Sequence, residues 1–166
     1  MIEIEGKILD VNPLLVEERL KALGATKKFS GKVSQEVYAK DGFSGHYRIR
    51  EMNNQIIVTL KTKTGSDTAR VKVRDEREKL VESKEQAIED AKALGFSYRE
   101  TLTKERIEYE KDKVFFCLDT YPDIPTFLEI EGPSEEIVLE WAKKLGFNED
   151  DVKPWGMKKI IQHYER

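Results

Sequence analysis

The stretch that decides the fold is Ile2–Ile8, with the sequence IEIEGKI. In a β-strand successive side chains point to opposite faces, so Glu3, Glu5 and Lys7 share one face and isoleucines occupy the other. Two carboxylates two residues apart on a rigid strand can hold one divalent cation. A lone antiparallel strand with one solvated face would look the same, and the distinction comes from recurrence of the pattern on other strands.

Composition is typical of one ordinary domain over residues 1–166. The chain has 29 bases, 32 acids, a formal net charge of -3 and 39% hydrophobic residues. This charge argues against a nucleic-acid partner held by a global positive field, although a locally basic pocket remains open. Cys117 is the only cysteine, which excludes a disulfide framework and a CxxC metal site. The chain has no apolar run long enough for a membrane span and no signal-peptide pattern, so we expect a cytoplasmic protein without a membrane partner.

Turn residues and alternation divide the chain into short elements. Helices are predicted after the capping residues Asn12, Ser83 and Ser134, each ended by a glycine, and a last short helix is predicted at Trp155–Tyr164. Eight stretches alternate as strands. They are Ile2–Leu9, Phe29–Ala39, Tyr47–Met52, Gln55–Thr62, Ala69–Val81, Phe96–Glu110, Val114–Thr120 and Phe127–Glu131.

Nearly every predicted strand has one charged face and one apolar face. Surface strands usually mix Thr, Ser, Gln and single charges, whereas these rows are sorted into bases and acids. The rows are Arg48 and Arg50; Lys61 and Lys63; Lys72, Arg74, Glu76 and Glu78; Lys104, Arg106 and Glu108; Asp119; and Glu129 with Glu131.

The few helices cannot cover an open sheet of this size, and an open sheet would leave its edges bare. We therefore predict an α+β fold in which a closed eight-stranded antiparallel β-barrel has helices packed outside. Apolar faces could meet in the middle and leave the charged rows solvated, but the sorted rows favour a charged lumen. Burying a bare ion costs several kcal/mol, so such a lumen must hold water, metal and a multiply charged ligand.

Bases beside acids in one lumen describe a site for a metal-chelated polyphosphate. Arginine grips phosphate through two parallel hydrogen bonds and lysine acts as a point charge. Ligand sets made only of acidic oxygens suit Mg²⁺ or Mn²⁺. The sequence contains no GxxxxGK motif, which excludes a P-loop.

Glu3-x-Glu5-x-Lys7 resembles the ExExK signature of the CYTH family, the triphosphate tunnel metalloenzymes. This family includes class IV adenylate cyclases, thiamine triphosphatases and inorganic tripolyphosphatases. The likeness runs in order through Arg48-x-Arg50, Lys61, Arg74 with Glu76, Lys104-x-Arg106, Asp119 and Glu129-x-Glu131. Within the family the chain is most similar to small archaeal and bacterial members regarded as candidate class IV cyclases, through Tyr47–Glu51 and Phe127–Glu131.

The resemblance implies an eight-stranded tunnel and a role for each matched residue. Triphosphate would be held by Lys7, Arg48, Arg50, Lys61, Arg74, Lys104 and Arg106. One or two Mg²⁺ or Mn²⁺ ions would be held by Glu3, Glu5, Asp119, Glu129 and Glu131, and the catalytic set would be Glu3, Glu5, Lys7, Lys104 and Arg106. Lys63, Lys72, Glu76 and Glu108 share the inward phase.

The function expected from this set is metal-dependent action on a small-molecule triphosphate. The enzyme would either hydrolyse the terminal phosphate or cyclise ATP to cyclic AMP and pyrophosphate. One alternative is a module that binds nucleotide or polyphosphate without turnover. A barrel for single-stranded nucleic acid is disfavoured, because the aromatic residues fall in the apolar phase. The molecule is expected to be a monomer or homodimer, and the sequence places no base-recognition pocket.

Several residues that could have a functional role are more simply explained by packing or by exposure to solvent. Cys117 is interpreted as a structural thiol, and His46 and His163 as solvated. Trp141 and Trp155 are interpreted as packing residues. Lys158 and Lys159 fit a solvated helix face better than a closure of the tunnel mouth. The similar stretches IEIEG at 2–6 and LEIEG at 128–132 suggest an internal repeat that could bring two acidic strands face to face.

Overall fold

The computed structural model describes residues 1–165. The strands are β1 (Ile2–Ile8), β2 (Thr26–Ala39), β3 (Gly45–Met52), β4 (Gln55–Lys63), β5 (Lys72–Val81), β6 (Ser97–Lys111), β7 (Val114–Thr120) and β8 (Phe127–Gly132). The helices are α1 (Pro13–Ala22), α2 (Lys84–Ala93), α3 (Glu135–Lys144), α4 (Met157–Tyr164) and the short 3-10 helix η1 (Glu149–Asp151).

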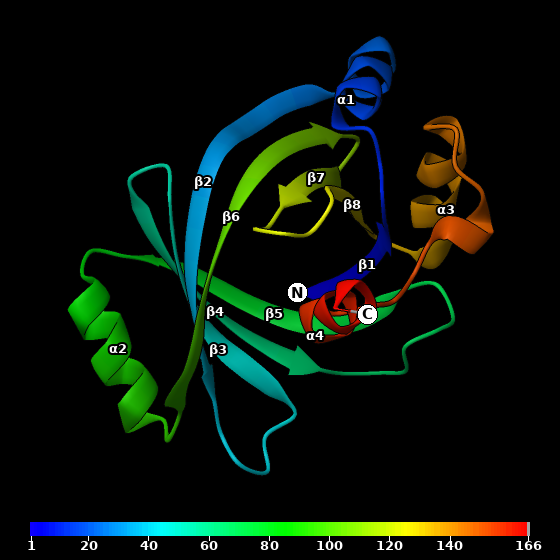
Figure 1. Ribbon diagram of the computed structural model, residues 1–166. Coiled ribbons are helices and arrows are strands. Elements are labelled where there is room, and N and C mark those ends of the chain that lie inside the picture. Colours follow the sequence, from blue (N-terminus) through cyan, green and yellow to red (C-terminus); the bar gives the residue numbers. More distant parts are fainter. Residues whose placement is uncertain (166) are drawn as a thin grey trace.

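The strands close into an antiparallel barrel in the order β1-β5-β4-β3-β2-β6-β7-β8, with the α-helices outside (Figure 1). The predicted fold class is therefore confirmed. β1 and β8 are hydrogen-bonded neighbours, with Glu5 opposite Glu131. The two acidic strands of the suspected repeat thus lie side by side rather than face to face.

The first three α-helices begin and end where the sequence indicates. The side chains of Asn12, Ser83 and Ser134 each accept a hydrogen bond from the backbone N–H three residues later. These bonds satisfy N–H groups that have no partner inside the helix. Gly24 and Gly146 follow α1 and α3 with φ values of 83° and 89°, in the left-handed region that glycine adopts readily.

Several predicted boundaries were wrong, among them the start of β3, which is Gly45 rather than Tyr47. β2 begins at Thr26 rather than Phe29, because its ladder with β6 extends back to a pairing of Thr26 with Glu110. β5 begins at Lys72 rather than Ala69, because the Thr68 hydroxyl accepts the backbone N–H groups of residues 70 and 71 and holds that segment in a loop. The last helix begins after Trp155, because residue 153 pairs as a β-bridge with residue 7 and keeps the chain extended.

The apolar faces of most strands point outward and are covered by helices, whereas Val33 and Val37 of β2 face inward opposite Lys104 and Arg48. Leu20 of α1 and Val138 of α3 pack in one core with Phe116 and Ile130 of the barrel wall. Across the barrel, Ala87 and Ala91 of α2 pack on Tyr47, Ile49 and Val58 in a separate core. Most apolar surface is therefore buried around the barrel, and a smaller cluster with Tyr121, Phe127 and Ile160 of α4 lies on the lumen side.

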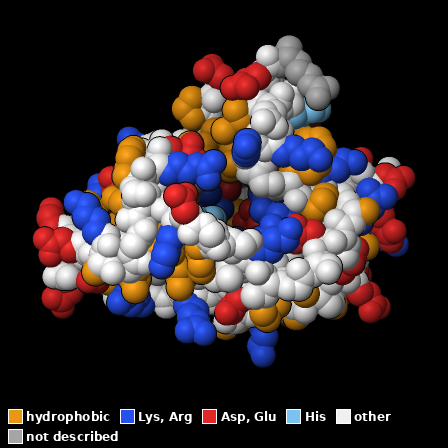
Figure 2. Space-filling model, turned by 90° about the horizontal axis from the view of Figure 1, so that it is seen from below, with side chains coloured by type: hydrophobic (Ala, Val, Ile, Leu, Met, Phe, Trp, Pro, Cys, Tyr) orange, Lys and Arg blue, Asp and Glu red, His pale blue; other side chains and the backbone are white. Residues whose placement is uncertain are grey.

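The charged faces point into the lumen, as predicted. Residues directly opposite each other on antiparallel neighbours share a face, and the ladder pairs Lys7 with Glu129, Lys61 with Glu76, and Arg106 with Asp119. Figure 2 shows a hollow in one face of the molecule with Lys, Arg, Asp and Glu side chains around it. The buried polar side chains are Glu5, Lys7, Gln35, Arg50, Thr59, Lys61, Glu76, Lys104, Arg106 and Asp119.

No helix within residues 1–165 has the length and apolar character needed to cross a membrane.

Candidate active site

Three carboxylates gather where β1 meets β8. Glu3, Glu5 and Glu131 each offer an oxygen, and these oxygens all lie within 4.8 Å of one another. Gly6 lies between Glu5 and Lys7 on the outer side of the wall. A Cβ there would come within 2.5 Å of Val152 Cγ1, so the glycine lets the chain after η1 lie directly against β1.

Two members of this group of three carboxylates, here called the acidic triad, have raised pKa values. Burial, a hydrogen bond with Glu76 and the charge of Glu131 raise the pKa of Glu3 to about 10. Burial and the charges of Glu129 and Glu5 raise the pKa of Glu131 to about 8. A carboxylate with a raised pKa readily binds a proton or a metal ion. The acidic triad therefore fits a hard divalent cation.

Glu5 differs from the other two members because lysines surround it. Lys72 Nζ lies 3.0 Å from Glu5 Oε1, Lys7 Nζ lies 3.4 Å from the same oxygen, and Lys61 Nζ lies 3.6 Å from Glu5 Oε2. Burial opposes ionisation, but these three charges hold the pKa of Glu5 well below its usual range. Burial and the charge of Lys7 in turn lower the pKa of Lys72 to about 8.

Two arginine–glutamate pairs join β3 to β5 across the intervening strand β4. Arg48 Nη2 lies 3.1 Å from Glu76 Oε1, and Arg50 Nη2 lies 2.6 Å from Glu78 Oε2. The Nε groups of both arginines are buried and have no hydrogen-bond partner among residues 1–165. Burial and the neighbouring Arg48 lower the pKa of Arg50 to about 10.

Asp119 of β7 is clamped by two cations of β6. Arg106 donates Nε–H to Oδ1 at 2.7 Å and an Nη2 hydrogen to Oδ2 at 2.7 Å, and Lys104 Nζ lies 3.0 Å from Oδ2. Burial opposes its charge, but Arg106 and Lys104 hold the pKa of Asp119 far below its usual range. This carboxylate already has close positive partners, as Glu5 does, whereas the charges that raise the pKa of Glu131 come from neighbouring acids.

The structure brings most of the predicted residues together, and two groups stand apart. The Arg74 guanidinium turns to the loop between β4 and β5, where Nη1 lies 2.6 Å from Asp67 Oδ1. Asp119 and Glu129 lie outside the acidic triad and bind cations instead, Glu129 through Lys7 Nζ at 3.1 Å. Their assignment as metal ligands stays a prediction.

His46 was predicted to be solvated, and this is wrong. It is half-buried on the inner face of β3, where it pairs in register with Lys61. Burial and the charges of Arg48 and Lys61 lower its pKa to about 4, so its imidazole is neutral near pH 7. Its position in phase with Arg48 was the signal in the sequence that could have placed it in the lumen.

Gln35 and Tyr121 line the lumen and were missed. Gln35 lies on the inner face of β2, opposite Arg50 of β3, and Tyr121 directly follows β7. The signal for Gln35 was a polar residue in phase with Val33 and Val37 on an otherwise apolar row.

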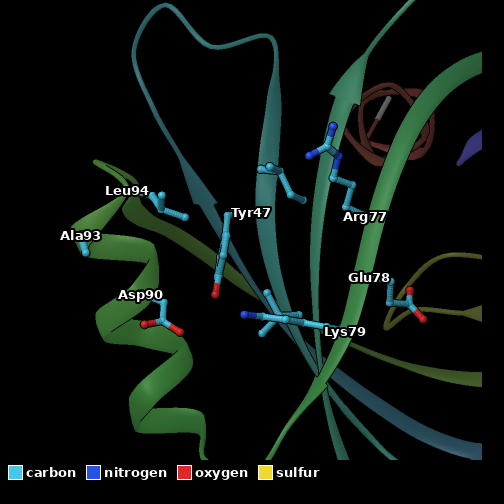
Figure 3. Close-up of a pocket in the computed structure, with 9 residues that line it drawn as sticks. Tyr47, Arg77, Glu78, Lys79, Asp90, Ala93 and Leu94 are labelled. Carbon is cyan, nitrogen blue, oxygen red and sulfur yellow. The ribbon is translucent and has the colours of Figure 1, made fainter.

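A separate cavity of about 480 Å³ lies outside the barrel, between α2 and the outer faces of β3, β4 and β5 (Figure 3). Tyr47, Val58 and Leu60 line it together with Arg77 and Lys79. The two cations belong to the same strand as Glu76 and Glu78 but point to the opposite face. This cavity therefore contains none of the residues that the sequence assigned to the site.

Comparison with known proteins supplies the family. The model of the CYTH domain matches residues 1–152, so the chain belongs to the CYTH domain family. No curated protein matches it. Among solved structures, the protein PH1012 from Pyrococcus horikoshii superposes with a TM-score of 0.80 at 26% identity, over 95% of this chain and 98% of that chain.

Two more distant structures share the fold. A candidate adenylate cyclase from Vibrio parahaemolyticus has a TM-score of 0.81 at 14% identity and covers 98% of each chain. The Hippeastrum protein HpAC1, described as having a dominant triphosphatase activity, has a TM-score of 0.62 at 13% identity, over 97% of this chain and 95% of that chain. At these identities the likeness shows the fold alone.

Proposed function

We propose that this protein is a divalent-metal-dependent enzyme that acts on a triphosphate inside the barrel lumen. The observation that carries the proposal is the acidic triad, with oxygens within 4.8 Å of one another, on the same inner surface as a set of buried lysines and arginines. Membership of the CYTH domain family supports it. That residues 1–166 form one such domain in the cytoplasm stays a prediction.

Glu3, Glu5 and Glu131 are the proposed metal ligands. Oxygen-only ligands suit Mg²⁺ or Mn²⁺. When bound, the metal supplies charge neutralisation at the phosphate oxygens and can activate a water molecule. Asp119 and Glu129 can join the ligand set only after phosphate has replaced them on Arg106, Lys104 and Lys7, the cations that they bind in this structure.

The proposed triphosphate-binding residues are cations whose partners are exchangeable carboxylates. A triphosphate offers several anionic oxygens and can take the place of these carboxylates on arginine and lysine. Because the β-strands hold the cations in position before substrate arrives, they stabilise charge in the transition state without reorganisation. The set is Lys7, Arg48, Arg50, Lys61, Lys104 and Arg106, with Arg74 at the rim.

Two reactions are compatible with such a site. If water attacks the terminal phosphorus, the products are inorganic phosphate and the diphosphate. If the ribose 3'-hydroxyl of ATP attacks the α-phosphorus, the products are cyclic AMP and pyrophosphate. How the substrate lies along the lumen decides between them.

The test is a substrate panel. Tripolyphosphate, thiamine triphosphate and ATP are each incubated with the protein and Mg²⁺ or Mn²⁺, and phosphate, pyrophosphate and cyclic AMP are quantified. We expect release that stops on addition of EDTA. Metal-dependent binding without any product would point to the binding module instead, and absence of both binding and turnover would reject the proposal.

A further inference from the structure

Gln35 is a buried amide on the inner wall of the barrel. Its side chain is 5% exposed, and the ladders place it opposite Arg50 on β3 and Leu102 on β6. Its Nε2 donates a hydrogen bond to the Tyr121 hydroxyl at 3.4 Å. Its Oε1 is buried and has no hydrogen-bond partner among residues 1–165.

An unpartnered buried amide oxygen destabilises the fold, and native proteins contain few of them. The neighbouring strand carries two more unpartnered atoms, the Nε groups of Arg48 and Arg50. These two donors match phosphate oxygens. The Gln35 oxygen is an acceptor and needs an N–H or O–H donor, which a fully ionised phosphate chain does not have.

The surroundings of Gln35 also differ from the phosphate-binding part of the lumen. The Tyr121 ring is 6% exposed and stacks on Phe127, with ring centroids 6.0 Å apart and 7° between the planes. Leu102 packs in the same apolar cluster. Lys104 Nζ lies 5.5 Å from the centroid of the Tyr121 ring. The apolar wall of Tyr121, Phe127 and Leu102, with the Gln35 oxygen as hydrogen-bond acceptor, is therefore next to the cations that would bind phosphate.

We propose that Gln35 and Tyr121 form the subsite for the organic group of the substrate. Gln35 Oε1 accepts a hydrogen bond from an N–H or O–H of that group, and the Tyr121 ring contacts its apolar part. The preferred substrate is then an organic triphosphate with a hydrogen-bond donor, such as a nucleoside triphosphate, over inorganic tripolyphosphate. This inference rests on the proposed function and extends it to the substrate class.

The test compares Gln35→Met, which keeps the length of the side chain and removes the acceptor, with the unaltered protein on ATP and on tripolyphosphate. We expect kcat/KM for ATP to fall about 10- to 100-fold, as when a site loses one hydrogen bond to its substrate. We expect kcat/KM for tripolyphosphate to change by less than about twofold, since no contact to it is lost. Ser34→Ala, next along β2 with its side chain on the outer face, is the matched control and should match the unaltered protein on both substrates.

Equal losses on ATP and tripolyphosphate would overturn the inference, because Gln35 would then serve the phosphate chain. Unchanged kinetics on both substrates would overturn it as well. In either case turnover by the unaltered protein would leave the proposed function standing, whereas absence of turnover on every triphosphate would remove both. The melting temperature of Gln35→Met, expected to be no lower than that of the unaltered protein, separates loss of a contact from loss of the fold.

Discussion

Asp119 and Glu131 lie on the inner faces of adjacent strands, yet their pKa values are shifted in opposite directions. Arg106 and Lys104 clamp Asp119 and hold its pKa far below the usual range despite burial. Burial also acts on Glu131, and together with the charges of its acidic neighbours Glu129 and Glu5 it raises the pKa to about 8. Because burial raises the pKa of both carboxylates, the charge of the neighbours decides which of the two is ready for a metal ion.

The largest expected effect comes from neutralising the acidic triad. Glu131→Gln and Glu5→Gln should each lower metal-dependent kcat by about 1,000-fold or more, because each removes a metal ligand. Steady-state turnover checks this, and circular dichroism should show an intact fold. Glu136→Gln, on the exposed face of α3, is the matched control and should retain full activity. Undiminished turnover in both triad variants would reject the metal assignment.

The Asp119 clamp should matter most for stability. Asp119→Asn leaves Arg106 and Lys104 without their shared anion, and breaking a buried ion pair costs about 3 kcal/mol. Urea unfolding measures this loss of unfolding free energy. Asp123→Asn, in the exposed loop before β8, should have no effect. A clamp variant as stable as the unaltered protein would show that water in the lumen already screens these charges.

The two carboxylates also predict opposite pH responses. The pKa of Glu131 in the folded state, about 8, lies above its ordinary 4.5. Stability from this group is therefore complete below about pH 4.5 and is lost as the pH rises through 8. Asp119, with a depressed pKa, adds stability that is lost only under acid conditions.

We therefore expect Glu131 alone to lower the unfolding free energy of the metal-free protein by roughly 3 kcal/mol between pH 5 and pH 8. Saturating Mg²⁺ should reduce this loss, because the metal replaces the proton on the triad. Urea titrations in EDTA and in Mg²⁺ at both pH values make the comparison. A metal-free protein that becomes more stable toward pH 8 would contradict the charge state assigned to the triad.

The smallest effect that we expect is the difference in KM between loss of a cation from the lumen and loss of a cation from the outer face of the barrel. Lys61→Met should raise KM for the triphosphate about tenfold, because it removes one cation from the lumen. Arg77→Ala removes a cation from the outer face, beside α2, and should leave KM unchanged. Equal effects of both substitutions would mean that overall charge, rather than the lumen, attracts the substrate.

Alternation in the sequence was enough to predict the barrel and the direction of its faces. The period of two on each strand survives closure of the sheet, so Glu3, Arg50 and Lys61 lie inside as expected. Helix caps were equally local, as Asn12 and Ser134 show. The ends of the strands were less predictable. The start of β5, for example, depends on the hydrogen bonds that the Thr68 hydroxyl accepts in the preceding loop.

Pairing between distant strands could not be predicted from local pattern. The residues that clamp Asp119 come from β6, and the partner of Arg74 comes from a loop, so both contacts depend on register and on rotamers. Gln35 was missed because one polar residue in an apolar row gives little signal. Only the unpartnered oxygen in the structure indicated that Gln35 could bind substrate.

The most direct test of the account is a crystal structure with Mn²⁺ and a non-hydrolysable triphosphate analogue. Anomalous scattering locates the metal without assumptions about its ligands. We predict a manganese peak bounded by Glu3, Glu5 and Glu131, with the phosphates against the lysines and arginines of the lumen. Metal and phosphates bound on the outer surface, for example in the cavity beside α2, with the acidic triad empty, would contradict it.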